Sequence, residues 1–280
     1  MSAASAHLDF VVIGAMKAGT TSVFEFLAAH PDVCAPRNKE PHYFTRGYRL
    51  PASYYRWLFR HRREGQICGE ASPTYSWVRR YPQCPARLAV DAPDVRIVYL
   101  VRDPVERLLS HYRHHLLLGQ GPGDDDEGIG HRDLWDRSRY RDTIEAYLRH
   151  FPRDRLFVAD IDVLQREPLR LHGLLDFLGL DPSDAPPILP TANVSAGRLA
   201  VPGRVGRLAR TPVGSVIRDL VPGDALRWAK RQLARGTSGG GTGAVAPVEW
   251  DAAAVRSRFP ELSAEVDAQY AWVAAEFLGS

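Results

Sequence analysis

The chain has 280 residues, of which 45% are hydrophobic, so it can bury one large core and we predict a single domain over residues 1–280. The formal net charge is only +3, which speaks against a protein whose main partner is a nucleic acid. Most of the 36 basic residues are arginines, whose planar guanidinium groups suit paired oxygens such as those of phosphate or sulfate.

The first predicted strand is a short apolar run, Phe10 to Ile13, that is followed by Gly14. A continuous run of this kind is typical of a strand that is buried on both faces of a parallel sheet. Apolar residues at helical spacing then predict a helix from Thr20 to Ala29. Pro31 ends this helix because proline disfavours helical geometry in the residue before it.

Three more strands are predicted, at Ile67 to Gly69, Arg96 to Val101 and Arg155 to Asp160, with helical periodicity between them. Strands that alternate with helices favour an α/β fold with a central parallel sheet. After the strand that ends at Val101, Asp103 can cap a helix whose first residue is Pro104. We predict that this helix runs to about Leu118.

Two segments have compositions that speak against regular structure. Residues 119–130 combine glycines with a run of four acidic residues, and residues 236–245 are rich in glycine, so we predict a flexible loop at each. The amphipathic stretch from Asp251 to Phe277 predicts one or two helices that are separated at Pro260.

The three cysteines, Cys34, Cys68 and Cys84, are odd in number and lack the spacing of metal ligands, so neither a disulfide framework nor a zinc site is predicted. The first ten residues lack a basic start and an apolar run, and no later stretch approaches the roughly 20 apolar residues that span a bilayer. We therefore predict a cytoplasmic protein that does not bind membranes.

The segment from Gly14 to Thr21, GAMKAGTT, lies between a buried strand and a helix. Its small residues let backbone N–H groups approach a phosphate, the start of the helix offers unpaired donors, and lysine and threonine add side-chain contacts. In a nucleoside triphosphate loop, lysine would directly follow the second glycine, whereas Lys17 stands two positions before Gly19. The alternative interpretation is a tight helix start without a ligand.

The order lysine, any residue, glycine, threonine, threonine resembles the 5′-phosphosulfate loop of sulfotransferases that use PAPS (3′-phosphoadenosine 5′-phosphosulfate). This resemblance implies a P-loop-kinase-like three-layer fold. It also implies that the donor is bound by Lys17, Ala18, Gly19, Thr20, Thr21 and Ser22.

A second motif, RDPVERLLSHY, follows the strand that ends at Val101. Arg102 would emerge at the carboxyl end of that strand, where open α/β sheets bind ligands, and Ser110 lies two turns along the next helix. The motif resembles the family's 3′-phosphate site, in which these two residues bind the phosphate that distinguishes PAPS from ATP. The alternative interpretation of Arg102 is a structural salt bridge at the end of the strand. The resemblance also extends to a late loop, in which Gly197 and Arg198 would reach the same phosphate.

The segment NKEPHYF resembles the heparan sulfate N- and 3-O-sulfotransferase branch and its bacterial relatives, where a glutamate and a histidine border the acceptor. Glu40 and His42 match these residues. A positioned carboxylate or imidazole can accept the proton of an attacking hydroxyl, so either residue is a candidate base. Lys17 would stabilise the charge that develops on the departing nucleotide, and no metal is required. Residues 69–75, GEASPTY, resemble the segment that follows the second strand in the family. The family often has lysine where this chain has Ala71, and this difference weakens the case that the segment contacts the acceptor.

The resemblance covers roughly the first 200 residues and implies transfer of a sulfuryl group from PAPS to a hydroxyl or amine of a glycan or small-molecule acceptor, with release of PAP. One rival is a P-loop nucleotide kinase that acts on a small molecule, but the displaced lysine argues against it. Another is a nucleic-acid-binding role for the arginine-rich segment from Arg198 to Arg235, which lacks a recognisable motif. The oligomeric state and the nature of the acceptor stay open.

Overall fold

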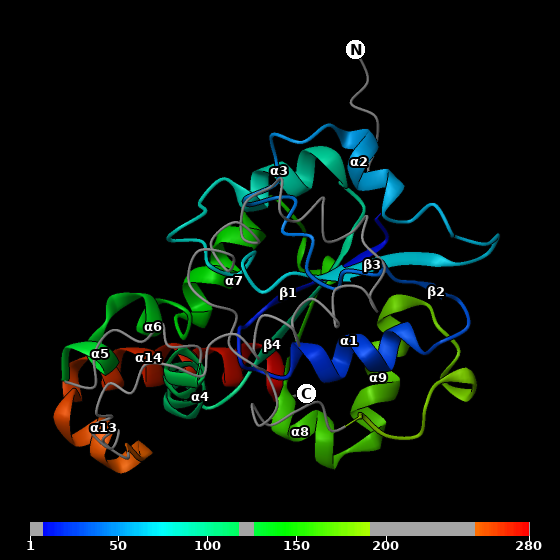
Figure 1. The fold of residues 1–280 in the computed structure, drawn as a ribbon. Coiled ribbons are helices and arrows are strands. Elements are labelled where there is room, and N and C mark those ends of the chain that lie inside the picture. Colours follow the sequence, from blue (N-terminus) through cyan, green and yellow to red (C-terminus); the bar gives the residue numbers. More distant parts are fainter. Residues whose placement is uncertain (1–7, 118–125, 191–249, 280) are drawn as a thin grey trace, which may run out of the picture.

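The computed structural model of the protein describes residues 8–117, 126–190 and 250–279. At its centre is a parallel sheet of five strands in the order β2-β3-β1-β4-β5 (Figure 1). The strands are β1 (Phe10–Gly14), β2 (Val33–Cys34), β3 (Ile67–Ala71), β4 (Arg96–Val101) and β5 (Leu156–Asp160).

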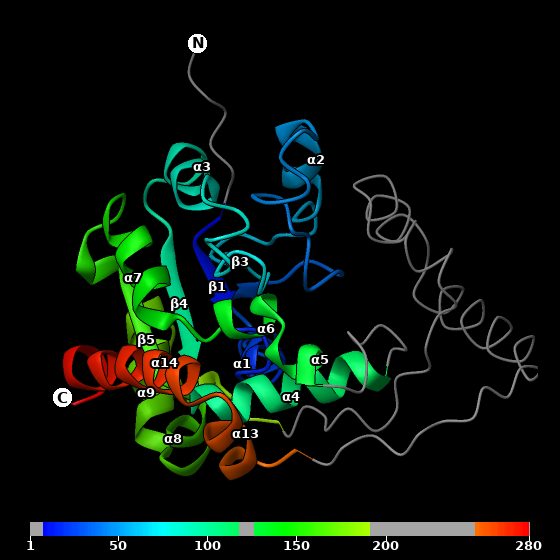
Figure 2. The same cartoon turned by 90° about the vertical axis from the view of Figure 1, so that its left-hand side faces the viewer.

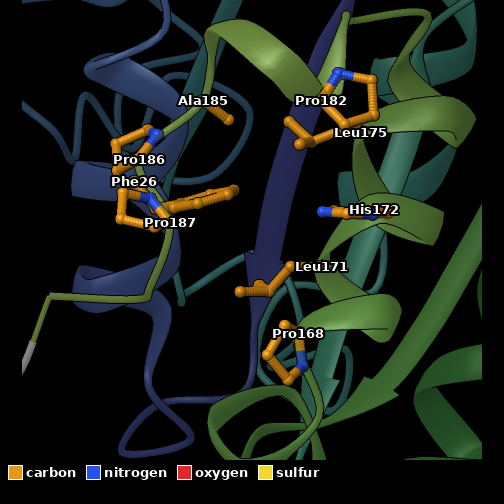
Figure 3. A pocket seen from close by; sticks show the side chains of 9 residues that line it. All are labelled: Phe26, Pro168, Leu171, His172, Leu175, Pro182, Ala185, Pro186 and Pro187. Atoms are coloured by element: carbon orange, nitrogen blue, oxygen red, sulfur yellow. The ribbon is translucent and has the colours of Figure 1, made fainter.

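Helices cover both faces of this sheet. In Figure 1, α1 (Thr20–Ala28), α8 (Ile161–Arg166) and α9 (Pro168–Leu178) lie below the sheet, and α3 (Cys84–Asp91) and α7 (Tyr140–Leu148) lie above it. A small pocket between α1 and α9 is lined by Phe26 on one side and by Leu171 and Leu175 on the other (Figure 3). The predicted three-layer α/β fold is therefore confirmed.

Four of the strands were predictable because they read as apolar runs. Val11, Val12 and Ile13 of β1 are fully buried, as are Ile97 and Val98 of β4, since both strands have neighbours on either side and helices on both faces. The prediction missed β2, because a strand of two residues carries no periodicity. It also ended β3 two residues early, at Gly69 rather than at Ala71.

The segment after β4 follows the predicted cap. Asp103 Oδ1 accepts hydrogen bonds from the backbone N–H groups of Val105 (3.0 Å) and Glu106 (2.9 Å), and α4 runs over Pro104–Leu117. The prediction of a flexible loop over 119–130 is wrong for its last five residues, which form α5 (Asp126–Gly130). The reason is that the side chain of Ile129 is buried against α4 and α6, an apolar contact that the acidic composition of the segment concealed.

The remaining described elements are short helices and the C-terminal helices. They are α2 (Ala52–Trp57), α6 (Arg132–Asp136), η1 (Arg153–Arg155), η2 (Pro182–Asp184), α13 (Ala252–Arg258), α14 (Pro260–Val273) and a final π-helical turn (Ala274–Leu278). The predicted break at Pro260 is confirmed. Figure 2 shows α13 and α14 beside α4 and α7, where Val255 and Val266 pack with Val105 and Leu108 in a second apolar cluster. The predicted loop at 236–245 and the arginine-rich segment before it lie outside the described residues.

Candidate active site

The loop between β1 and α1 is fixed to the neighbouring strand. The backbone N–H of Ala15 donates to Leu100 O of β4 over 2.7 Å, and Arg107 Nη1 of α4 donates to Met16 O over 3.3 Å. Lys17 and Gly19 both have positive φ, 71° and 72°. Gly19 caps α1, and a Cβ there would lie 2.3 Å from Ile161 Cγ1, so the position requires glycine both for its conformation and for its space.

The first turn of α1 contains no acidic residue, and no side chain caps it. Backbone donors at such a helix start favour an anion. Thr20 and Ser22 are buried and Thr21 is half-buried. The hydroxyls of both threonines accept hydrogen bonds from Lys39 Nζ, at 3.2 Å for Thr20 Oγ1 and 3.0 Å for Thr21 Oγ1.

Arg102 follows the last residue of β4. Because β1 and β4 are parallel neighbours, Arg102 and the Lys17 loop emerge at the same edge of the sheet. The backbone oxygen of Arg102 accepts a hydrogen bond from Tyr140 Oη (2.8 Å), which fixes the chain at this point. Its Nε is buried without a hydrogen-bond partner among the described residues, and the nearest carboxylate oxygen paired with it, Asp162 Oδ2, is 3.6 Å away. A guanidinium N–H of this kind can donate a hydrogen bond to an anionic ligand.

Ser110, the second residue of the predicted 3′-phosphate site, lies on α4 and is half-buried. The same helix contacts the Lys17 loop through Arg107, so the loop and α4 border one region. Gly197 and Arg198 lie outside the described residues, and their predicted contribution stays a prediction.

The candidate bases are joined in a chain of polar contacts. Lys39 Nζ lies 3.2 Å from Glu40 Oε1, and Glu40 Oε2 lies 3.5 Å from His42 Nε2. His42 Nδ1 is 2.9 Å from Thr74 Oγ1, in the turn after β3. Glu40 keeps 40% of its side chain exposed, so a carboxylate that is linked to the threonines of α1 through Lys39 is accessible to solvent. The contact of Lys39 with α1 was not predicted, because no local spacing in the sequence indicates it.

A second glutamate lies behind this chain. Glu70 of β3 is completely buried and accepts hydrogen bonds from Tyr75 Oη (2.5 Å), Ser72 Oγ (2.7 Å) and Tyr55 Oη (3.4 Å). Burial raises the pKa of Glu70 to about 7, while these hydrogen bonds oppose the increase. Ser72 Oγ also accepts the backbone N–H of His42 over 3.0 Å, so Glu70 orients the backbone of a candidate base through one hydroxyl. No spacing or motif in the sequence indicated this role for Glu70.

Within the described part of the chain, no group of three or more histidine, cysteine, aspartate or glutamate side chains is arranged to hold a metal ion. The independence of the reaction from metal stays a prediction.

Curated relatives match the region that contains these motifs. The mouse heparan sulfate glucosamine 3-O-sulfotransferase 3A1 is 34% identical over 181 residues, which cover 61% of this chain and 45% of that protein. The membrane-associated sulfotransferase kil1 of Dictyostelium discoideum is 34% identical over 110 residues, or 37% of this chain and 22% of that protein. The chain spans about half the length, or less, of the curated relatives it matches.

These relatives overturn the predicted cytoplasmic location. The heparan sulfate enzymes among them are Golgi-lumenal and kil1 is membrane-associated, so a cytoplasmic location does not follow from similarity. The prediction relied on missing signals in the sequence, which is a weaker basis than the location of relatives. None of the helices in residues 8–117, 126–190 and 250–279 combines the length and the apolar composition that crossing a membrane requires.

The family and the fold are shown by two further comparisons. The solved sulfotransferase from Alicyclobacillus acidocaldarius superposes with a TM-score of 0.56 at 24% identity and covers 80% of this chain and 98% of its own, which supports the fold. Sulfotransferases have the P-loop-kinase-like arrangement predicted from the loop. The family model for the sulfotransferase domain matches residues 7–192, two thirds of the chain and all the described candidate site residues. The chain therefore belongs to the sulfotransferase domain family.

Proposed function

We propose that the protein is an enzyme that transfers a sulfuryl group from PAPS to a hydroxyl or amine of a glycan or small-molecule acceptor and releases PAP. The observation that carries this proposal is the position of two anion-binding motifs at the ends of adjacent parallel strands. The Lys17 loop follows β1 and Arg102 follows β4, within a chain that belongs to the sulfotransferase family.

In this proposal the donor lies across the edge of the sheet. Residues 17–22 would bind the 5′-phosphosulfate through backbone N–H groups and through the side chains of Lys17 and the two threonines. Arg102 and Ser110 would bind the 3′-phosphate, with Gly197 and Arg198 from the late loop. Within the described residues, Arg102 Nε has no hydrogen-bond acceptor and only an ion pair with Asp162 at 3.6 Å, and this supports the assignment because a phosphate oxygen would supply the missing acceptor.

The chemical step is an in-line displacement at sulfur. The acceptor oxygen or nitrogen forms a bond to sulfur while the bond between sulfur and the bridging phosphate oxygen breaks, and PAP leaves with that electron pair. Glu40 or His42 accepts the proton of the acceptor group. Lys17 stabilises the negative charge on the departing oxygen. Because the reaction is analogous to phosphoryl transfer, positioning and electrostatics supply most of the acceleration.

Lys39 is a further functional residue in this proposal. Its ammonium group binds the threonine hydroxyls of α1 and the Glu40 carboxylate at the same time. The residue would thereby hold the base beside the sulfuryl group and add positive charge near the transition state.

The relatives bear on the acceptor. Several are named as enzymes that sulfate the 3-O position of glucosamine in heparan sulfate, which favours a carbohydrate hydroxyl over other acceptors here. Family membership disfavours the nucleotide kinase. The expectation that the protein does not bind nucleic acid stays a prediction, and the oligomeric state stays open.

The proposal is tested by calorimetric titration with PAP and ATP, each with and without EDTA, followed by incubation with labelled PAPS and an acceptor panel. We expect tight PAP binding that EDTA does not change, and labelled product from at least one acceptor. ATP binding that depends on magnesium, without PAP binding, would establish the kinase instead.

A further inference from the structure

The C-terminal helices α13 and α14 lie beyond residues 7–192, the part that matches the family model, yet they reach the edge of the sheet where the donor site is proposed. Their apolar side chains pack on α4, and α14 also lies against α7 (Figure 2). Packing of this kind explains how the helices are held. Their polar contacts indicate a second role.

Strands β4 and β5 share an arrangement at their carboxyl ends. Asp103, just after β4, caps α4 with Oδ1, and Asp160, the last residue of β5, caps α8 with Oδ1 by accepting the N–H groups of Asp162 (2.7 Å) and Val163 (3.3 Å). In both residues the other carboxylate oxygen is bound by the C-terminal helices. Arg256 Nη2 of α13 donates to Asp103 Oδ2 over 3.0 Å, and Tyr270 Oη of α14 donates to Asp160 Oδ2.

Arg102 lies beside residues that these contacts hold. It directly precedes Asp103, its backbone oxygen is held by Tyr140, and its Nε faces Asp162 at 3.6 Å. The Tyr140 ring in turn lies edge-on to the Tyr270 ring of α14, with centroids 6.1 Å apart. The C-terminal helices therefore contact the groups on both sides of Arg102.

The charges of Asp103 and Arg256 affect how strongly the site binds the donor. Asp103 places a carboxylate next to the arginine that would bind the 3′-phosphate, and an uncompensated carboxylate there would repel a phosphate. Arg256 offsets part of this charge, because it is shared between Asp103 and Asp267, to which it also donates through Nε and Nη2, each at 3.3 Å. Because the side chains of Arg256 and Asp103 remain 37% and 41% exposed, their ion pair contributes little to stability, and we expect the protein to fold without it.

We propose that Arg256 is a positioning residue for the 3′-phosphate of the donor: it offsets part of the charge of Asp103 and fixes the start of α4, and thereby raises the affinity of Arg102 and Ser110 for that phosphate. The inference rests on the proposed donor site. It extends that site to a helix outside the matched family region and requires no contact between Arg256 and the nucleotide.

The test compares the affinities of PAP and of adenosine 5′-phosphate, which lacks the 3′-phosphate, for a set of variants. Arg256→Gln is expected to weaken PAP binding about two- to fivefold and to leave adenosine 5′-phosphate binding unchanged, since the 3′-phosphate is the group that lies near Asp103 in the proposed site. Arg256→Lys keeps the charge and should lose less. Asp103→Asn in the Arg256→Gln background should restore most of the PAP affinity, because asparagine still caps α4 and carries no charge.

Equal weakening of both nucleotides, no weakening of either, or failure of the Asp103→Asn change to restore PAP affinity would overturn the inference. Melting temperatures of all variants serve as a folding control, and if Arg256→Gln does not fold, the lysine variant and Asp103→Asn alone decide the question. An unsubstituted protein that does not bind PAP would overturn the proposed donor site itself, and the inference with it.

Discussion

Lys39 Nζ donates a hydrogen bond to Thr21 Oγ1 over 3.0 Å, and so links the loop that carries the candidate base to the first turn of α1. The same ammonium group lies 3.2 Å from Glu40 Oε1. One cation therefore holds the proposed acceptor side and the proposed donor side of the site together, although 18 residues separate Lys39 from Thr21 along the chain.

Substitution of Lys39 tests this link. Lys39→Met should lower kcat by about tenfold or more, because the base loses its anchor and the site loses a positive charge near the transferred group. Lys39→Arg is the matched control and should retain most of the activity. The measurement is steady-state sulfuryl transfer with labelled PAPS. Full activity of the methionine variant would show that the contact is only structural.

Substitution of Glu40 tests the identity of the base. Glu40→Gln should lower kcat by about 10²- to 10⁴-fold, the usual contribution of a general base, and leave PAP affinity nearly unchanged. Transfer rates and PAP titrations of the same preparation separate the two effects. If Glu40→Gln turns over normally, His42 becomes the base, and His42→Gln should then abolish transfer.

Substitution of Arg102 tests the 3′-phosphate site. Arg102→Ala should weaken PAP binding by about 10- to 100-fold, since a hydrogen-bonded ion pair with phosphate is lost, while adenosine 5′-phosphosulfate should bind almost as before. Calorimetric titration of both ligands measures the difference. An equal loss for both would assign Arg102 another role.

Substitution of Gly19 tests the packing of the loop. Gly19→Ala should reduce the free energy of unfolding by about 1 to 3 kcal/mol, because alanine is strained at positive φ and its Cβ would collide with Ile161. Thermal unfolding measures the loss. Ile161→Ala alone also destabilises the protein, because Ile161 is buried, but it removes the collision, so the double variant should lose less stability than the sum of the two single variants. If the two losses simply add, the close contact with Ile161 is not the cause.

The buried Glu70 predicts a dependence of stability on pH. Its pKa is raised in the folded protein to about 7 from its ordinary value of 4.5, so between these pH values the folded state binds more protons than the unfolded state. The stabilisation is therefore complete below about pH 4.5 and is lost as pH rises through 7, with a total of about 3 kcal/mol. Denaturant unfolding at pH 4.5, 6 and 8 measures this loss.

Glu70→Gln provides the comparison for that measurement. It removes the titrating group and keeps an amide of similar size, so its free energy of unfolding should change less than that of the unsubstituted protein over the same pH range. Parallel pH profiles for the two proteins would show that Glu70 does not titrate there.

The sequence by itself determined the α/β fold and the two anion-binding motifs of this protein. Both depend on local patterns: β1 and β4 read as apolar runs, and GAMKAGTT and RDPVERLLS directly follow strands. Since parallel strands end at one edge of a sheet, the order of the elements was enough to predict that Lys17 and Arg102 would emerge on the same side.

Only the tertiary structure decided which distant residues complete the site. No periodic pattern in the sequence indicates three contacts of the site. These are the contact of Lys39 with Thr21, the buried position of Glu70 behind His42, and the pairing of Arg256 with Asp103 across 153 positions. The physical reason is that strand and helix patterns record which face of an element is buried. The partner of a polar side chain, in contrast, depends on how strands align and helices pack, which the spacing of residues along the chain does not record.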